Sequence, residues 1–152
     1  IPIIAAGGIW DKKDIDKFIS LGCAGVQMAT RFIGTNECDA DAKFKDVLLN
    51  AKEEDIILMS SPVGLPARGV KTNLQFSIEN HTAPKVQCIS NCVAPCNRGT
   101  EAKIVGYCIA DRLGAAYKGD VDTGLFFSGS NGYKIDKIIS VKELMEKLTK
   151  GE

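Results

Sequence analysis

Small residues follow two apolar runs of the chain, and their order is typical of a phosphate-binding site. The first run, over 1–6, ends in a diglycine, and the second, over 24–28, leads into a short stretch with a threonine. A diglycine lets the backbone approach a ligand closely, and its N–H groups can point at an anion. The residues that could form the two walls are Gly7 and Gly8 on one side and Gln27, Met28, Ala29 and Thr30 on the other. A plain tight turn at the glycines is the alternative.

Four of the six cysteines form a second group with chemical potential. Cys88, Cys92, Cys96 and Cys108 are spaced C-x₃-C-x₃-C-x₁₁-C. Four thiolates could hold zinc or an iron–sulfur cluster, although this spacing is not that of the usual zinc knuckles or ferredoxin runs. The alternative is a set of small, half-buried or redox-labile thiols. No secretory pattern opens the sequence, so we expect no disulfide scaffold.

The single histidine, His81, lies in a polar stretch without a motif around it. Histidine is a favoured general base, but a catalytic role needs supporting geometry. We therefore predict a surface residue and name no catalytic residue in this chain.

Composition narrows the class of protein. Of 152 residues, 45% are hydrophobic and 25% charged, with 19 basic and 19 acidic side chains. These proportions are typical of a globular domain, and the zero formal charge gives no electrostatic footprint for nucleic acid or a membrane surface. We expect a cytoplasmic protein that binds neither.

The elements that position the small residues read as a βαβ unit. The run over 1–6 predicts a strand buried on both faces, as in a parallel sheet. Asp11 can cap a helix that Gly22 ends, and the run over 24–28 predicts a second, parallel strand. Two βα units are too few to close a barrel. We therefore expect the remaining strands to come from an N-terminal portion that this sequence lacks.

Helical and irregular segments are predicted for the rest of the chain. Ser140 and Glu143 form a capping box for the last helix, whose buried face would contain Val141, Leu144, Met145 and Leu148. The other predicted segments are a helix over 39–52, an apolar run over 56–59, a Pro/Gly-rich loop over 61–66, an irregular excursion over 71–103, a helix over 109–119 and a strand-like run over 125–127.

Several further residues have two interpretations. Arg31 and Arg68 could contact phosphate or substrate, but ion-paired surface positions are the commoner outcome. The Ser/Gly/Asn stretch over 128–131 could line a ligand pocket or form an ordinary turn. Trp10 could cover the phosphate site or belong to the core.

The strings over 1–9 (IPIIAAGGI) and 25–32 (GVQMATRF) resemble the FMN-phosphate segment of nitronate monooxygenases (2-nitropropane dioxygenases) and related FMN-dependent enoyl-acyl-carrier-protein (ACP) reductases. The stretches over 61–68 and 122–131 resemble the same family, and the similarity is weakest over 71–103. One departure is Ala29, where the family usually has glycine.

This resemblance implies an α/β fold, the C-terminal part of a TIM (β/α)₈ barrel with an added C-terminal α+β segment. Residues 1–36 would be the last βα units with the FMN-phosphate loops, and 37–152 the helical and irregular segment with the cysteine cluster. Gly7, Gly8 and the stretch over 27–30 would bind FMN, whereas the family's catalytic histidine would lie upstream of this chain. A homodimer remains open.

The implied function is FMN-dependent oxidation of nitronates or nitroalkanes. Three alternatives stay open: an FMN-dependent enoyl-ACP reductase, a metal-binding interaction module built on the cysteines, and a phosphate-sugar-binding barrel fragment without flavin. The substrate in each enzymatic case is a small molecule, a nitronate or an enoyl thioester.

Overall fold

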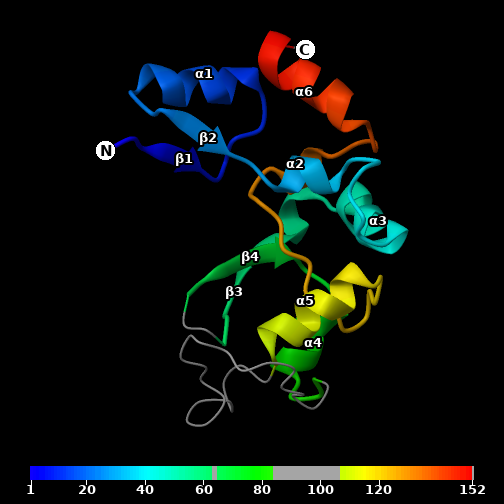
Figure 1. Cartoon of the computed structure of the whole chain (residues 1–152). Helices are drawn as coiled ribbons and strands as arrows, with labels where there is room; N and C mark the ends of the chain where they lie inside the picture. Colours follow the sequence, from blue (N-terminus) through cyan, green and yellow to red (C-terminus); the bar gives the residue numbers. More distant parts are fainter. Residues whose placement is uncertain (63–64, 84–106, 152) are drawn as a thin grey trace.

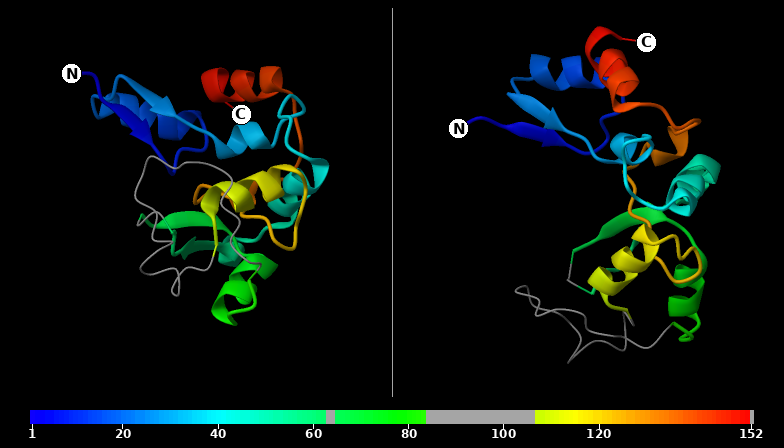
Figure 2. Two further views of the ribbon diagram at one scale, coloured as in Figure 1. Left: turned by 60° about the horizontal axis from the view of Figure 1, so that its bottom comes forward. Right: turned by 45° about the vertical axis from the view of Figure 1, so that its right-hand side comes forward.

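The computed structural model describes residues 1–62, 65–83 and 107–151. The chain is mixed α/β, with one parallel and one antiparallel pair of strands (Figure 1). Helix α6 runs beside α1 at one end, whereas α4 and α5 lie with the antiparallel pair at the other, as the two views of Figure 2 also show. The two small sheets therefore belong to opposite parts of the molecule.

A parallel βαβ unit opens the chain, as the sequence predicts. Strand β1 (Ile4–Ala6) pairs with β2 (Gly25–Gln27), and α1 (Lys12–Ser20) connects them. The Asp11 side chain accepts a hydrogen bond from the Asp14 N–H at 3.0 Å and caps α1. Gly22, at φ +95°, follows the helix in the left-handed conformation that ends it.

The expected burial of the first strand on both faces is wrong for the described residues. Ile4 is 55% exposed, and the neighbouring Ile3 is exposed as well. In the described part of the chain β1 has only β2 as a hydrogen-bonded neighbour. Its apolar side chains are therefore left partly exposed.

The next segment holds two helices, α2 (Thr30–Ile33) and α3 (Ala42–Asn50). Helix α3 is shorter than the predicted span of 39–52, because it begins only after Asp41, whose side chain accepts from the Lys43 N–H at 2.8 Å. A 3₁₀ turn, η1 (Glu53–Asp55), leads from it into the second sheet.

The second sheet pairs β3 (Ile56–Met59) with β4 (Ala67–Val70) in antiparallel register. The prediction of an irregular excursion is wrong over its first part, where α4 (Asn73–Glu79) forms. Its start is a capping box in which Gln75 Oε1 accepts from the Thr72 N–H at 2.7 Å. Residues 84–103 lie outside the described ranges.

Helix α5 (Ile109–Tyr117) ends near Gly119, at φ +80°, as the sequence predicts. The strand-like run over 125–127 forms a single bridge, Gly69 to Phe127, beside β4. The Val70 N–H also donates to the Phe126 carbonyl at 2.9 Å, so the segment follows β4 without extending into a full strand.

The chain closes with the 3₁₀ turn η2 (Gly132–Lys134) and α6 (Val141–Lys150). Ser140 Oγ accepts from the Glu143 N–H at 3.1 Å, which confirms the Ser140 half of the predicted capping box. Leu144 and Leu148 are buried, but Met145 is 44% exposed and does not belong to the buried face. It follows Leu144 directly, and consecutive helical residues point in different directions.

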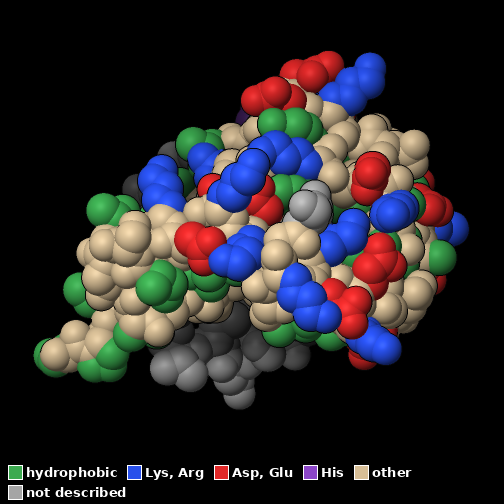
Figure 3. Space-filling model, turned by 90° about the horizontal axis from the view of Figure 1, so that it is seen from above, with side chains coloured by type: hydrophobic (Ala, Val, Ile, Leu, Met, Phe, Trp, Pro, Cys, Tyr) green, Lys and Arg blue, Asp and Glu red, His purple; other side chains and the backbone are tan. Residues whose placement is uncertain are grey.

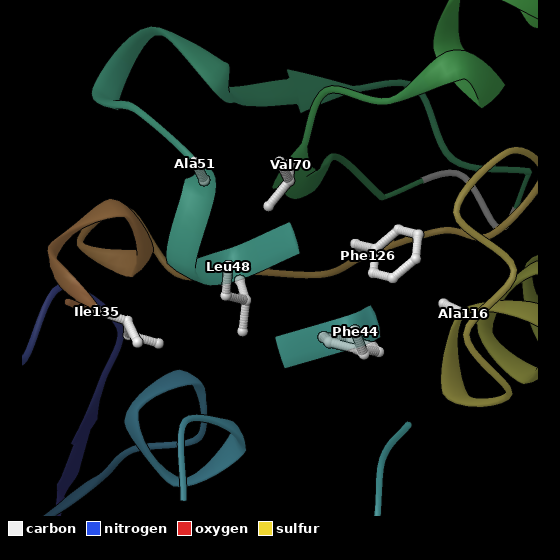
Figure 4. Close-up of a cluster of buried hydrophobic side chains, with 7 residues drawn as sticks. All are labelled: Phe44, Leu48, Ala51, Val70, Ala116, Phe126 and Ile135. Carbon is white, nitrogen blue, oxygen red and sulfur yellow. The ribbon is translucent and has the colours of Figure 1, made fainter. Parts of the chain in front are cut away.

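The main core joins α3, β4, α5 and the segment after α5 (Figure 4). Phe44 and Phe126 meet edge to face, with ring centroids 4.8 Å apart. The fit is close, since a Cβ added to Gly69 would lie 2.4 Å from the Phe126 carbonyl oxygen. The buried members of this core are Phe44, Leu48, Ala51, Val70, Ala116, Phe126 and Ile135.

The surface over α1 and α6 carries both signs of charge. Lysine and arginine side chains are interspersed there with aspartate and glutamate (Figure 3). Among the described residues no helix has the length and apolar character needed to cross a bilayer.

Candidate phosphate-binding site

A cavity of about 560 Å³ lies beside the carboxyl ends of β1 and β2 and the start of β4. Three loops form most of its wall: 6–10 after β1, 27–31 after β2, and 128–132 before η2. Residues 65–68, at the start of β4, complete it. The six residues predicted to bind the cofactor, Gly7, Gly8, Gln27, Met28, Ala29 and Thr30, all line this cavity.

The diglycine adopts a backbone conformation that favours glycine. Gly7 and Gly8 have φ of +88° and +72°, in the left-handed region. A Cβ added to Gly7 would meet nothing within 4 Å, so the conformation, and not a lack of space, selects glycine here. The loop thus presents bare backbone to the cavity, as an anion site requires.

The second loop contains Ala29, where the family usually has glycine. Ala29 has φ −129°, outside the left-handed region that favours glycine, so an alanine can occupy this position. The Thr30 hydroxyl oxygen accepts a hydrogen bond from the Gly129 N–H at 2.8 Å. Thr30 is therefore more than the first residue of α2, because it also fixes the third loop.

The third loop, residues 128–132, contacts both of the others. Asn131 Nδ2 donates to the Gly8 carbonyl at 3.0 Å, across 123 residues of sequence. A Cβ on Gly132 would collide with the Ser128 side chain, so the loop is tightly folded on itself. Of the two interpretations of this stretch, the cavity-lining one fits the structure.

Trp10 and Arg31 link the first two loops. Arg31 Nη1 donates to the Trp10 carbonyl at 2.7 Å, and the guanidinium lies 4.6 Å from the indole centroid. Trp10 is half-buried, and it both lines the cavity and packs against the main core, so both interpretations fit the structure. Arg68 is exposed and also lines the cavity.

Apolar residues that the sequence did not single out for the site also line the cavity. They are Leu65, Ile109 and Phe127, from three separate segments. Nearby, burial raises the pKa of Tyr107 to about 12, so this phenol stays protonated and donates to the Ser60 carbonyl at 2.8 Å. An isolated apolar residue carries no sequence signal for such a role.

The predicted metal site cannot be followed as a whole. Cys88, Cys92 and Cys96 lie outside the described residues, and Cys108 is a free, half-buried thiol at the start of α5. Within the described ranges no three His, Cys, Asp or Glu side chains gather to hold a metal. His81 is exposed, at φ +56°, and does not line the cavity.

The model of the nitronate monooxygenase family matches residues 1–151, which is nearly the whole chain. The chain belongs to the nitronate monooxygenase family. A probable nitronate monooxygenase of Staphylococcus aureus (strain Newman) is 40% identical over 70 residues, which are 46% of this chain and 20% of that one. The match therefore covers only about a fifth of the length of this curated relative of the nitronate monooxygenase family.

Solved structures agree with the family assignment. FabK from Thermotoga maritima is similar with a TM-score of 0.77 and 28% identity, over 99% of this chain and 44% of that one. A nitroalkane oxidase from Streptomyces ansochromogenes shares the fold, with a TM-score of 0.69 and 22% identity, over 99% of this chain and 39% of that one. The resemblance to the nitronate monooxygenase and enoyl-ACP reductase family is confirmed.

Proposed function

We propose that this chain is the phosphate-binding part of an FMN-dependent oxidoreductase that oxidises nitronates or nitroalkanes. The observation that carries the proposal is the convergence of the left-handed diglycine and Thr30 on one cavity. Membership of the nitronate monooxygenase family supports the reaction.

The residues present fit FMN. A cavity of about 560 Å³ falls within the usual range for cofactor sites, roughly 300–1,000 Å³. Gly7 and Gly8 would hold the phosphate through their N–H groups, and Gln27, Met28, Ala29 and Thr30 would form the facing wall. When bound, FMN supplies the redox chemistry, and the chain binds and orients it.

We further propose that residues 1–36 are the last βα units of a TIM barrel and that 37–152 form its appended segment. The exposed apolar face of β1 and the small share of each relative that this chain covers support this division. In the proposed barrel, the catalytic base comes from a strand upstream of the chain.

The first experiment is an absorption spectrum of the full-length protein, followed by denaturation. We expect a yellow protein that releases FMN, and turnover of a nitronate with consumption of oxygen. A colourless protein containing zinc, or a brown one without flavin, would contradict the proposal and favour the metal-binding module. A colourless protein that binds only sugar phosphates would favour the barrel fragment without flavin.

Reduction of an enoyl thioester is the second candidate, and the similarity to FabK supports it. Both candidates use the same phosphate site, so the cavity does not separate them. Rapid reduction of the flavin by NAD(P)H and its reoxidation by an enoyl thioester would favour the reductase. Turnover of a nitronate without NAD(P)H would favour the monooxygenase.

A further inference from the structure

We infer that loop 128–132 is a third wall of the FMN-phosphate site, in which Ser130 contacts the phosphate and Asn131 is a positioning residue for the diglycine. The inference rests on the proposed function. It deepens that function by assigning roles to residues far from both phosphate loops in sequence.

One hydrogen bond joins each pair of the three loops. Arg31 Nη1 donates to the Trp10 carbonyl and ties the second loop to the first. The Gly129 N–H donates to Thr30 Oγ1 and ties the third loop to the second. Asn131 Nδ2 donates to the Gly8 carbonyl and closes the ring. No loop can move away from the cavity without breaking one of these bonds.

The bond from Asn131 falls where the backbone most needs support. Glycine at positive φ is conformationally free, so the Gly7-Gly8 loop has little intrinsic stiffness. The Gly8 carbonyl and the Ile9 N–H belong to one planar, trans peptide unit and point in opposite directions. By holding the carbonyl, Asn131 therefore also sets the direction of an amide donor beside the cavity.

Ser130 lies over the same glycine. A Cβ added to Gly8 would be 3.9 Å from Ser130 Oγ, and both residues line the cavity. A hydroxyl at this place reaches an anion held by the diglycine. It would add a neutral donor to the backbone amides.

The test compares FMN with riboflavin, which lacks the phosphate, on the full-length apoprotein. For Asn131→Ala we expect the Kd for FMN to rise about tenfold, the loss of roughly one good hydrogen bond, with the Kd for riboflavin unchanged. Asn131→Asp keeps the size of the side chain, removes the donor and adds a negative charge near the phosphate, so it should raise the Kd for FMN by more than Asn131→Ala does. For Ser130→Ala we expect a smaller rise, about fivefold, again for FMN only.

Asn80→Ala is the matched control. Asn80 Nδ2 also donates to a backbone carbonyl, that of Phe76, at 2.9 Å, but it is exposed and does not line the cavity. We expect this variant to bind both flavins as the wild type does.

An Asn131→Ala or Asn131→Asp variant that binds FMN like the wild type would overturn the inference. An equal loss of affinity for FMN and riboflavin would also overturn it, since that result is expected of a residue with a purely structural role. If the wild type itself binds no FMN, the proposed function fails first, and the inference falls with it.

Discussion

At the scale of single residues, Thr30 illustrates how one side chain can serve two loops. Its hydroxyl oxygen accepts from the Gly129 N–H, so its own proton remains to donate elsewhere. Sequence reasoning placed Thr30 at the phosphate but gave no indication of this second contact. The Thr30 hydroxyl therefore also holds loop 128–132 in place, a role that its motif does not predict.

Replacing Thr30 by valine keeps the shape of the side chain and removes the acceptor. We expect the free energy of unfolding to fall by about 1 kcal/mol and FMN to be lost more readily, because the Gly129 N–H is left without its partner. Thr30→Ser keeps the hydroxyl and serves as the control. Chemical denaturation and flavin release measure the two effects, and a valine variant that matches the serine variant in both would refute the role.

Asp120 offers a prediction about pH. Its carboxylate accepts hydrogen bonds from the Thr123 hydroxyl and from the backbone N–H groups of Thr123 and Asp122. These bonds, of which the one from the Thr123 hydroxyl has the largest effect, lower the pKa of Asp120 below its ordinary value of 3.8. Because the folded pKa is the lower one, the charged form stabilises the protein above pH 3.8. That contribution is lost as the pH falls through the folded pKa.

The variant Asp120→Asn should accordingly be less stable than the wild type at neutral pH, and the difference should shrink on acidification below about pH 4. Urea unfolding at several pH values gives the comparison. Asp46→Asn, on the exposed side of α3, makes the same chemical change as a control. A difference that grows on acidification would contradict the assignment.

At the scale of elements, local signals decided what the sequence could predict. Asp11 and Gly22 mark the ends of α1, and Ser140 marks the start of α6, because caps act within one helical turn. Helix α4 was missed although Thr72 and Gln75 form a readable capping box, since the polar surroundings hid it.

Contacts between distant elements could not be read from the sequence. The segment over 125–127 was predicted as a strand, but its place beside β4 depends on the close approach of Gly69 to Phe126. The bond from Asn131 to Gly8 likewise depends on how the whole chain folds. The sequence therefore predicted six residues that line one cavity, whereas the ring of bonds around them could not be predicted.

Gly69→Ala should separate β4 from the segment that carries loop 128–132. The added Cβ would lie 2.4 Å from the Phe126 carbonyl oxygen, an overlap that costs about 2 kcal/mol. Gly114→Ala, inside α5 with nothing within 4 Å of the new Cβ, should instead stabilise the protein by about 0.5–1 kcal/mol. Thermal unfolding of both variants checks the contrast, and equal effects would contradict it.

At the scale of the whole molecule, the main core adjoins the cavity, because Trp10 and Ile33 pack against that core and also line the cavity. Leu48, on α3, is a fully buried member of this core. We expect Leu48→Ala to lower the free energy of unfolding by about 2–5 kcal/mol and to loosen the flavin, although Leu48 does not line the cavity. Val121→Ala, at an exposed position, is the control, and full retention of flavin by a destabilised Leu48→Ala protein would separate core from site.

The isolated chain of 152 residues should fold poorly, because Ile1, Ile3 and Ile4 expose apolar surface that nothing in the described structure covers. Circular dichroism during heating is the measurement. A cooperative unfolding transition in the isolated chain would contradict this prediction.

The bond between Asn131 and Gly8 has a consequence for the order of events in the cell. A ribosome makes Asn131 123 residues after Gly8. At about 5–20 residues per second the delay is roughly 6 to 25 seconds. During that interval the nascent chain holds two of the three loops but not the third. On the proposed function, tight loading of FMN then follows synthesis of loop 128–132 and is a late step in the protein's maturation.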